Sequence, residues 1–307
     1  MAGMTETSRR EFLIQLSSVG ALLSSPVRWR AQDTLPTRAI PSSGETLPIV
    51  GLGSTKPVLG ILSDGPEPLA SVMRMLVARG GRVVDSAPRT VDIDAEFGRL
   101  MNELDIHDQI FLATKINATG KDAGIEQMRQ TQRLFGRRTM DLIQIESLTD
   151  LETQWPNLRE WKEIGEARYI GVTVSNDALH EGLESFMRRE TPDFVHLNYS
   201  VVETRAEDRL LPLARDRGIA VLTNRPFMNG SYFGRVGGRE LPEWAAEFDC
   251  ASWAQFSVKY ILSHPAVTCC LTETTNPSHM QDNIQAGFGR LPDGATKRRM
   301  RELVRRF

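Results

Sequence analysis

Residues 110–116 have the sequence Ile-Phe-Leu-Ala-Thr-Lys-Ile, an aliphatic run with one lysine near its end. A short run of this composition is typical of a buried strand. The same pattern, an apolar run that ends at polar residues, occurs eight times, at 48–54, 82–87, 110–116, 141–147, 169–175, 194–200, 220–226 and 267–273. Most runs begin roughly 25–34 residues apart, which leaves room for one helix in each crossover of a parallel sheet.

The segments between the runs have helical periodicity. Residues 67–79, 206–217 and 253–263 place apolar side chains three and four positions apart. Gly80 and Gly218 follow two of these segments, at helix ends where a left-handed conformation favours glycine. Eight βα units without a glycine-rich first turn favour an α/β fold of one domain, a (β/α)8 TIM barrel, over a doubly wound open sheet.

Composition is that of an ordinary folded protein. Of the 307 residues, 40% are hydrophobic and 25% are charged, and the net charge is −2. The chain therefore has no basic field that would attract nucleic acid. The cysteines are Cys250, Cys269 and Cys270, an odd number that does not form a disulfide framework. Adjacent Cys269 and Cys270 would lie on opposite faces of a strand, so we expect buried thiols.

The N-terminus has the features of an export signal. Arg9 and Arg10 precede a weakly apolar stretch, residues 12–27, that is too short and too polar for a stable membrane span. Residues 1–31 resemble a twin-arginine (Tat) signal, which predicts the Tat machinery as a partner and a periplasmic or exported protein of residues 32–307. The alternative is an ordinary amphipathic helix with two surface arginines.

Two segments do not belong to the βα pattern. Residues 227–240 form a glycine-rich insertion after the seventh strand, where a barrel has its catalytic face, so it is either a lid or a floppy loop. Residues 297–307 carry five arginines on one side and apolar residues on the other. We expect this segment to be a helix packed on the barrel, with contact to an anionic membrane as the lesser alternative.

Polar residues end several of the predicted strands, where barrels place their chemistry. Asp85, Lys115 and Glu146 end three consecutive strands. A lysine inside an aliphatic run costs several kcal/mol to bury unless a carboxylate pairs with it, and either acidic residue is a suitable partner. The pattern predicts a functional cluster rather than scattered structural ion pairs.

Several motifs in chain order are similar to those of the aldo/keto reductase family. They are residues 47–53 (LPIVGLG), 84–87 (VDSA) followed by Glu96 and Gly98, 111–115 (FLATK), 140–145 (MDLIQI), 165–172 (GEARYIGV), and Asn276-Pro277 through Asn283. The resemblance spans about residues 40–286. It implies a barrel that reduces carbonyl groups with NADPH, using an Asp, a Tyr, a Lys and a His.

Only half of that catalytic set matches. Asp85 and Lys115 occupy the expected positions, whereas Thr90 stands at the tyrosine position and Glu146 at the histidine position. An alcohol is a far weaker acid than a phenol, so Thr90 is no simple replacement. A phenol from elsewhere, Tyr199 or Tyr232, is one alternative. The other is Glu146, since a steroid double-bond reductase branch of the family also carries Glu there, and an enclosed carboxyl can donate a proton.

The resemblance also indicates a cofactor site that has diverged. The residues matching the nicotinamide contacts are Thr173, Val174, His196 and Asn224. Near the last helix, Glu273 and His279 stand where the family holds the adenosine 2′-phosphate, and Asn283 is retained. A carboxylate repels a phosphate, so the sequence favours NAD over NADP if a nucleotide binds.

Three functions remain open. The first is an NAD(P)(H)-dependent oxidoreductase that reduces a carbonyl or an enone with an altered proton donor. The second is a non-redox lyase or isomerase with Glu146 as general base and Lys115 stabilising an enolate. The third is a ligand-binding protein without catalysis. All three have a small-molecule ligand. The five scattered histidines predict no metal site, and the family resemblance implies a monomer.

Overall fold

The computed structural model describes residues 34–53 and 55–307, and residues Leu35–Phe307 form one compact unit. The predicted export signal, residues 1–31, lies outside the described residues.

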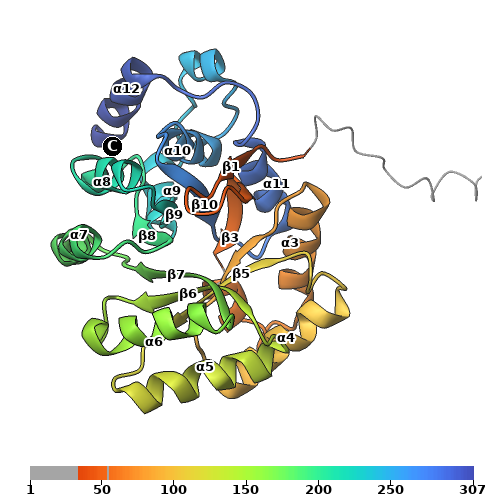
Figure 1. The fold of residues 1–307 in the computed structure, drawn as a ribbon. Helices are drawn as coiled ribbons and strands as arrows, with labels where there is room; N and C mark the ends of the chain where they lie inside the picture. The colour runs from red at the N-terminus through yellow and green to blue at the C-terminus, as the bar shows by residue number, and fades with distance from the viewer. Residues whose placement is uncertain (1–33, 54) are drawn as a thin grey trace, which may run out of the picture. The chain divides into compact units, whose positions relative to one another are not determined.

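Eight parallel strands close into a barrel, in the order β10-β3-β4-β5-β6-β7-β8-β9 (Figure 1). Their bounds are β3 Val50–Gly53, β4 Val83–Asp85, β5 Phe111–Ile116, β6 Met140–Glu146, β7 Ala167–Thr173, β8 Phe194–Asn198, β9 Ala220–Asn224 and β10 Val267–Thr272. Each predicted run coincides with one strand, although β6 begins one residue and β7 two residues before the predicted run. The predicted TIM barrel is confirmed.

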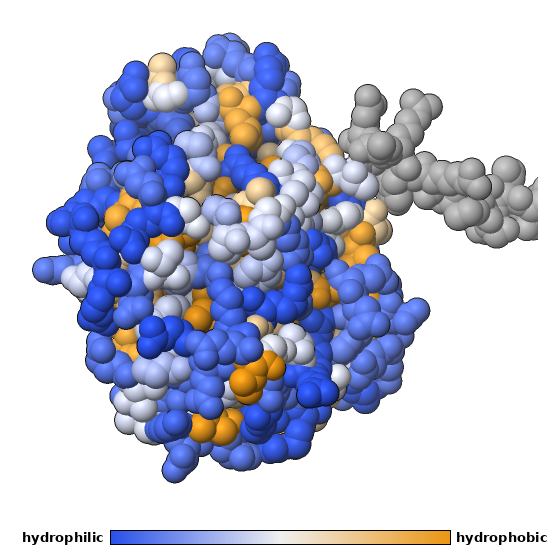
Figure 2. All heavy atoms as spheres, viewed as in Figure 1, coloured by the Kyte–Doolittle hydropathy of each residue, from blue (hydrophilic) through white to orange (hydrophobic). Residues whose placement is uncertain are grey.

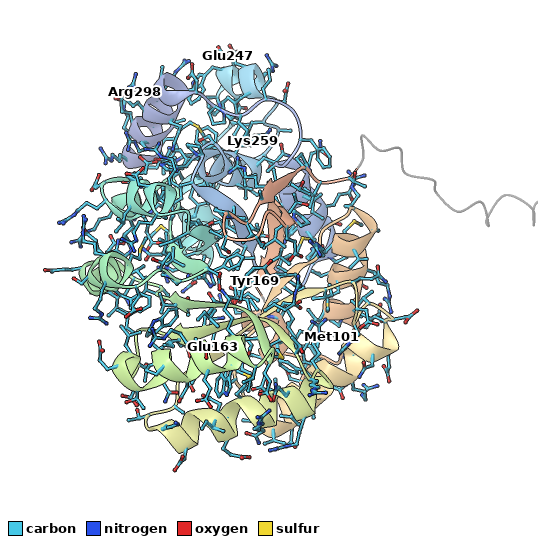
Figure 3. All side chains as sticks on the ribbon, viewed as in Figure 1. Met101, Glu163, Tyr169, Glu247, Lys259 and Arg298 are labelled. Atoms are coloured by element: carbon cyan, nitrogen blue, oxygen red, sulfur yellow. The ribbon has the colours of Figure 1, made fainter. Side chains whose placement is uncertain are left out.

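Successive residues of each strand point alternately into the barrel and out toward the helices. Phe111, Ala113 and Tyr169 belong to the inner cluster of buried side chains, and Leu112 belongs to the outer one. Tyr169 accordingly lies among the strands in Figure 3. On β10 Cys269 faces inward and Cys270 outward, and all three cysteines are free and buried, as predicted.

Helices surround the barrel as an outer layer (Figure 1). Gly98 on one of them shows how tightly the layer packs, because a Cβ there would lie 2.1 Å from the backbone oxygen of Leu134 on the next. The helices are α2 Thr55–Leu59, α3 Glu67–Ala78, α4 Val91–Glu103, α5 Lys121–Phe135, α6 Leu151–Glu163, α7 His180–Arg189, α8 Leu210–Asp216, α9 Ser231–Val236, α10 Trp253–Leu262, α11 Pro277–Gln285 and α12 Gly294–Arg305, with short 3-10 turns at Asp177–Leu179, Arg205–Glu207, Met228–Gly230 and Glu243–Phe248.

A short antiparallel hairpin precedes the barrel and is absent from the sequence prediction. It consists of β1 Thr37–Ala39 and β2 Thr46–Pro48. Ile40 and Leu47 are fully buried in the inner cluster, and Glu45 accepts a 2.8 Å hydrogen bond from the hydroxyl of Tyr169, which lies near the start of β7. The hairpin therefore closes the end of the barrel at which the strands begin.

The insertion at 227–240 is folded rather than floppy. It contains α9, whose Tyr232 is fully buried and donates a 3.0 Å hydrogen bond to the backbone oxygen of Trp253. The predicted C-terminal helix is α12, which buries Met300 and Val304. Within residues 34–53 and 55–307, no helix is long and apolar enough to cross a membrane. The face in Figure 2 is mostly hydrophilic, with small scattered apolar patches.

Candidate active site

A cavity of about 550 Å³ opens where the barrel strands end. It is lined by residues near the ends of the eight barrel strands and by the loops that follow them. Alternation places the polar residues there, because Lys115 follows inward-facing Phe111 and Ala113 at intervals of two, as Asp85 follows Val83. The predicted site residues that line the cavity are Asp85, Lys115, Glu146, Thr173, His196, Asn224 and Glu273.

Lys115 and Asp85 form a buried ion pair. The Lys115 ammonium lies 2.6 Å from a carboxylate oxygen of Asp85 and donates a second hydrogen bond of 2.7 Å to the backbone oxygen of Ser86. The other Asp85 oxygen is 3.3 Å from the amide nitrogen of Gln144. An ammonium has three N–H donors, so these contacts leave one for the cavity.

Glu146 stands apart from this pair. Its carboxylate accepts a 3.0 Å hydrogen bond from the side-chain amide of Asn117, which is itself held by Gln127. The side chain is half-buried. Of the two acidic partners considered for Lys115, the structure selects Asp85. Glu146 is free to face a ligand because Lys115 pairs with Gln144 in the register of the two strands, which leaves Glu146 two residues beyond the level of Lys115.

Thr90 does not line the cavity. It is the exposed N-cap residue of α4 and its side chain makes no capping hydrogen bond. Its neighbour Arg89 lines the cavity instead. Neither tyrosine replaces the missing phenol, because Tyr199 bonds to Glu207 outside the cavity and the hydroxyl of Tyr232 is held by Trp253.

His196 and Asn224 carry unsatisfied polar atoms beside the ion pair. Both ring nitrogens of buried His196 lack a hydrogen-bond partner, and Nδ1 lies 3.8 Å from Asp85. Burial lowers the pKa of His196 to about 4 against the opposing effect of Asp85, so the ring is neutral at pH 7. The side-chain oxygen of Asn224 is also buried without a partner, while its nitrogen donates to the Val174 backbone oxygen at 2.9 Å.

At the outer part of the cavity, hydrogen bonds connect α2 with the segments that follow β9 and β10. Glu273 accepts a hydrogen bond from the Lys56 backbone amide, and the Lys56 ammonium reaches the Asn229 backbone oxygen at 3.3 Å. The other two predicted nucleotide residues lie elsewhere on α11. His279 is exposed and Asn283 is buried, and neither lines the cavity, because the cavity stops at the loop that precedes this helix.

Sequence reasoning missed Arg89, Lys56 and Phe233 as cavity residues. The signal for Arg89 was its place four residues after Asp85 in a strand-end loop. Phe233 belongs to the insertion at 227–240, which the sequence predicts at the catalytic face, whereas nothing in the sequence marks Lys56. Across residues 34–53 and 55–307, no group of three or more His, Cys, Asp or Glu side chains could hold a metal ion.

The comparisons with known proteins agree on one family. The model of the aldo/keto reductase family matches residues 65–299. An Escherichia coli (strain K12) protein described as an NADH-specific methylglyoxal reductase is 26% identical over 155 residues, which is 42% of this chain and 46% of that protein. The match thus spans less than half of that relative's length.

Solved structures share the fold at low identity. The holo form of an aldo-keto reductase from Bacillus halodurans superposes with a TM-score of 0.68 and 18% identity, over 88% of this chain and 96% of that one. An aldo/keto reductase from Klebsiella pneumoniae in complex with NADP and acetate gives 0.70 and 16%, over 89% and 96%. With the family model covering most of the barrel, the strand-end motifs have a common origin, and the chain belongs to the aldo/keto reductase family.

Proposed function

We propose that the protein is a nicotinamide-dependent oxidoreductase that reduces a carbonyl group, or a double bond conjugated to one. The observation that carries this proposal is the Lys115 ammonium, which the pair with Asp85 holds at the cavity with one donor left over. That donor can hydrogen-bond a substrate oxygen and stabilise the negative charge that develops on it during reduction.

The unsatisfied atoms of His196 and Asn224 fit a nicotinamide. Its carboxamide has both a donor and an acceptor, the groups that a neutral imidazole and a free side-chain oxygen can pair with. Thr173, buried beside them at the end of β7, supplies a hydroxyl. When bound, the reduced nicotinamide supplies a hydride to an electrophilic carbon. The side chains of the cavity would orient that carbon and deliver the proton that the product oxygen gains.

The proton on the product oxygen comes from Glu146 or from water in this proposal. The described residues that line the cavity include no tyrosine, so the proposal assigns the proton to a group other than a phenol. The carboxyl group of Glu146 accepts its hydrogen bond from the side-chain amide of Asn117 rather than from a cation, and this bond orients it. A protonated carboxyl held in this way can serve as a general acid.

Glu273 supports NADH as the preferred cofactor. Its carboxylate lines the outer cavity, where it would repel the additional phosphate of NADPH. The Escherichia coli relative is described as NADH-specific, which supports the same choice.

We further propose export through the Tat machinery, with cofactor inserted before export. Replacing Arg9 and Arg10 with lysine should leave the protein in the cytoplasm, and unchanged export would overturn this.

The experiment that tests the reaction is a turnover assay of the full chain with NADH and with NADPH. Methylglyoxal, benzaldehyde and cyclohexenone are the carbonyl and enone probes, and Lys115→Met is the matched variant. We expect nucleotide oxidation that depends on the probe and on Lys115. Turnover that survives Lys115→Met unchanged would contradict the proposal.

The second candidate is a non-redox lyase or isomerase. It is favoured by Glu146, which accepts a hydrogen bond from Asn117 and forms no ion pair within the described part of the chain, as suits a general base. Lys115 would then stabilise an enolate. Incubation of a ketone probe in deuterated water without nucleotide separates the two functions. Deuterium at the α-carbon that is lost in Glu146→Gln supports the non-redox enzyme. A pure binding protein would show neither exchange nor turnover, and both variants would change only ligand affinity.

A further inference from the structure

Arg89 is a cavity cation without an ion pair. Two other cations of the cavity have acidic partners, since Lys115 pairs with Asp85, and Arg225 lies 3.1 Å from Glu203. The ammonium of Lys56, in the outer part of the cavity, is exposed and donates to the Asn229 backbone oxygen at 3.3 Å. Among residues 34–53 and 55–307, Arg89 forms no ion pair. A positive charge is therefore left at the β4 side of the cavity.

The hydrogen bonds of Arg89 are also incomplete. Nε and Nη2 are buried and have no partner, and Nη1 reaches only the neighbouring Pro88 backbone oxygen, at 3.5 Å. A distance of 3.5 Å is the outer limit of a hydrogen bond. A buried donor without an acceptor destabilises the fold, and the effect is larger in a charged group. A ligand that supplies acceptors at this place would relieve that cost.

Asp94 holds the backbone of Arg89 rather than its guanidinium. One Asp94 oxygen accepts a 3.0 Å hydrogen bond from the Arg89 backbone amide, and the other is buried without a partner. Burial raises the pKa of Asp94, against the opposing effects of this bond and of the nearby guanidinium charge. The loop is thus anchored beside the cavity while the guanidinium stays unpaired.

We propose that Arg89 is a carboxylate-binding subsite and that the substrate is an oxo acid. This inference rests on the proposed reduction for the role of the oxo group. Arg89 follows β4, and Lys115 ends β5, the strand paired with it. One small molecule can then place its oxo oxygen at Lys115 and its carboxylate at Arg89. A guanidinium binds a carboxylate through two parallel hydrogen bonds, which a neutral aldehyde cannot form.

A matched pair of probes tests this. Phenylglyoxylate and its methyl ester carry the same oxo group and differ in charge. We would measure kcat/KM with NADH for the wild type, Arg89→Met and Arg89→Lys, and the affinity of phenylglyoxylate by calorimetry. Arg74→Met, which removes an exposed arginine on α3, is the control. Thermal unfolding of each variant verifies folding.

Arg89→Met should lower kcat/KM for the acid roughly 10- to 100-fold, the effect of losing hydrogen bonds to a charged group, and change the ester less than about threefold. Arg89→Lys should recover part of the loss. Equal losses for acid and ester, or wild-type preference for the ester, would overturn the subsite. If neither probe turns over but phenylglyoxylate binds in an Arg89-dependent manner, the subsite stands and the proposed reduction fails. Turnover that does not depend on Arg89 would support the proposed reduction and overturn the subsite.

Discussion

The ammonium of Lys115 lies 2.6 Å from the carboxylate of Asp85, and both side chains are more than nine-tenths buried. The two residues come from neighbouring strands of the barrel and face its interior. A pair of this kind contributes little net stability, but each charge depends on the other for its compensation.

Breaking the pair on one side should destabilise the fold. We expect Asp85→Asn to lower the free energy of unfolding by about 3–5 kcal/mol, because it leaves the Lys115 ammonium buried without a charge partner. In the double variant Asp85→Asn/Lys115→Met, the loss should be smaller than the sum of the single losses. Urea unfolding of the four proteins measures the coupling, and strictly additive losses would contradict it.

Glu146→Gln should reduce kcat by about 10²- to 10⁴-fold if this carboxyl donates the proton. If Glu146 is the donor, the pH–rate profile of the variant should differ from that of the wild type. Asn117→Ala, which removes the 3.0 Å hydrogen bond to Glu146, should have a smaller effect. An unchanged pH–rate profile in Glu146→Gln would assign the proton to water.

His196 should make stability depend on pH. Burial lowers the pKa of His196 to about 4, below that of an unfolded histidine, while Asp85 and Lys115 act in opposite directions on it. Between these two pKa values the unfolded chain binds more protons, so stability is present at neutral pH and is lost as pH falls from about 6.5 toward 4. The loss amounts to about 3 kcal/mol for a shift of this size.

His196→Gln should remove that part of the dependence, as measured by urea unfolding at neutral and mildly acidic pH. His264, whose pKa burial likewise lowers to about 4, keeps its own contribution in the variant. An identical pH dependence in the two proteins would show that His196 is not responsible.

Glu207 should anchor the C-terminal helix. Its carboxylate accepts hydrogen bonds from Tyr260 at 2.9 Å, from Lys297 at 2.7 Å and from Arg301 at 2.9 Å, the last two on α12. Glu207→Leu should cost roughly 3 kcal/mol of unfolding free energy by leaving the Lys297 charge without its partner. Glu302, which is exposed on the same helix, is the control. Glu302→Gln should change the free energy of unfolding by less than about 0.5 kcal/mol. Similar values for both variants would contradict the anchor.

Glu273 should set the cofactor preference. Replacing its carboxylate in Glu273→Gln removes a negative charge from the outer cavity, so the affinity for NADPH should rise about tenfold while that for NADH changes little. Fluorescence titration of both nucleotides measures the ratio. If the affinities for NADPH and NADH changed by the same factor, the 2′-phosphate of NADPH would not bind near Glu273.

Much of the fold and part of the site follow from local sequence. Alternation along each run determines which side chains face inward, so the positions of Asp85 and Lys115 in a barrel could be predicted without coordinates. The hairpin β1–β2 could not, because strands of three residues carry too little periodicity to recognise.

The predicted site residues that do not line the cavity lie at the start of α4 and on α11. Counting along the chain placed Thr90 in the site, but whether Arg89 or Thr90 faces the cavity depends on how the loop enters α4, where Asp94 fixes the backbone. His279 was assigned by counting back along α11, and its direction depends on how that helix packs. Long-range packing of this kind is not encoded in the spacing of a few residues.

The central claim is that a nicotinamide nucleotide binds at the cavity beside Lys115. The most direct measurement is to denature the purified full chain, identify any released nucleotide by mass spectrometry, and titrate the nucleotide-free protein with NADH and NADPH by fluorescence. We predict stoichiometric nucleotide or micromolar binding, stronger for NADH and weakened in an Asn224→Ala variant. No released nucleotide and no binding at millimolar concentration would contradict the account and leave non-redox catalysis or ligand binding.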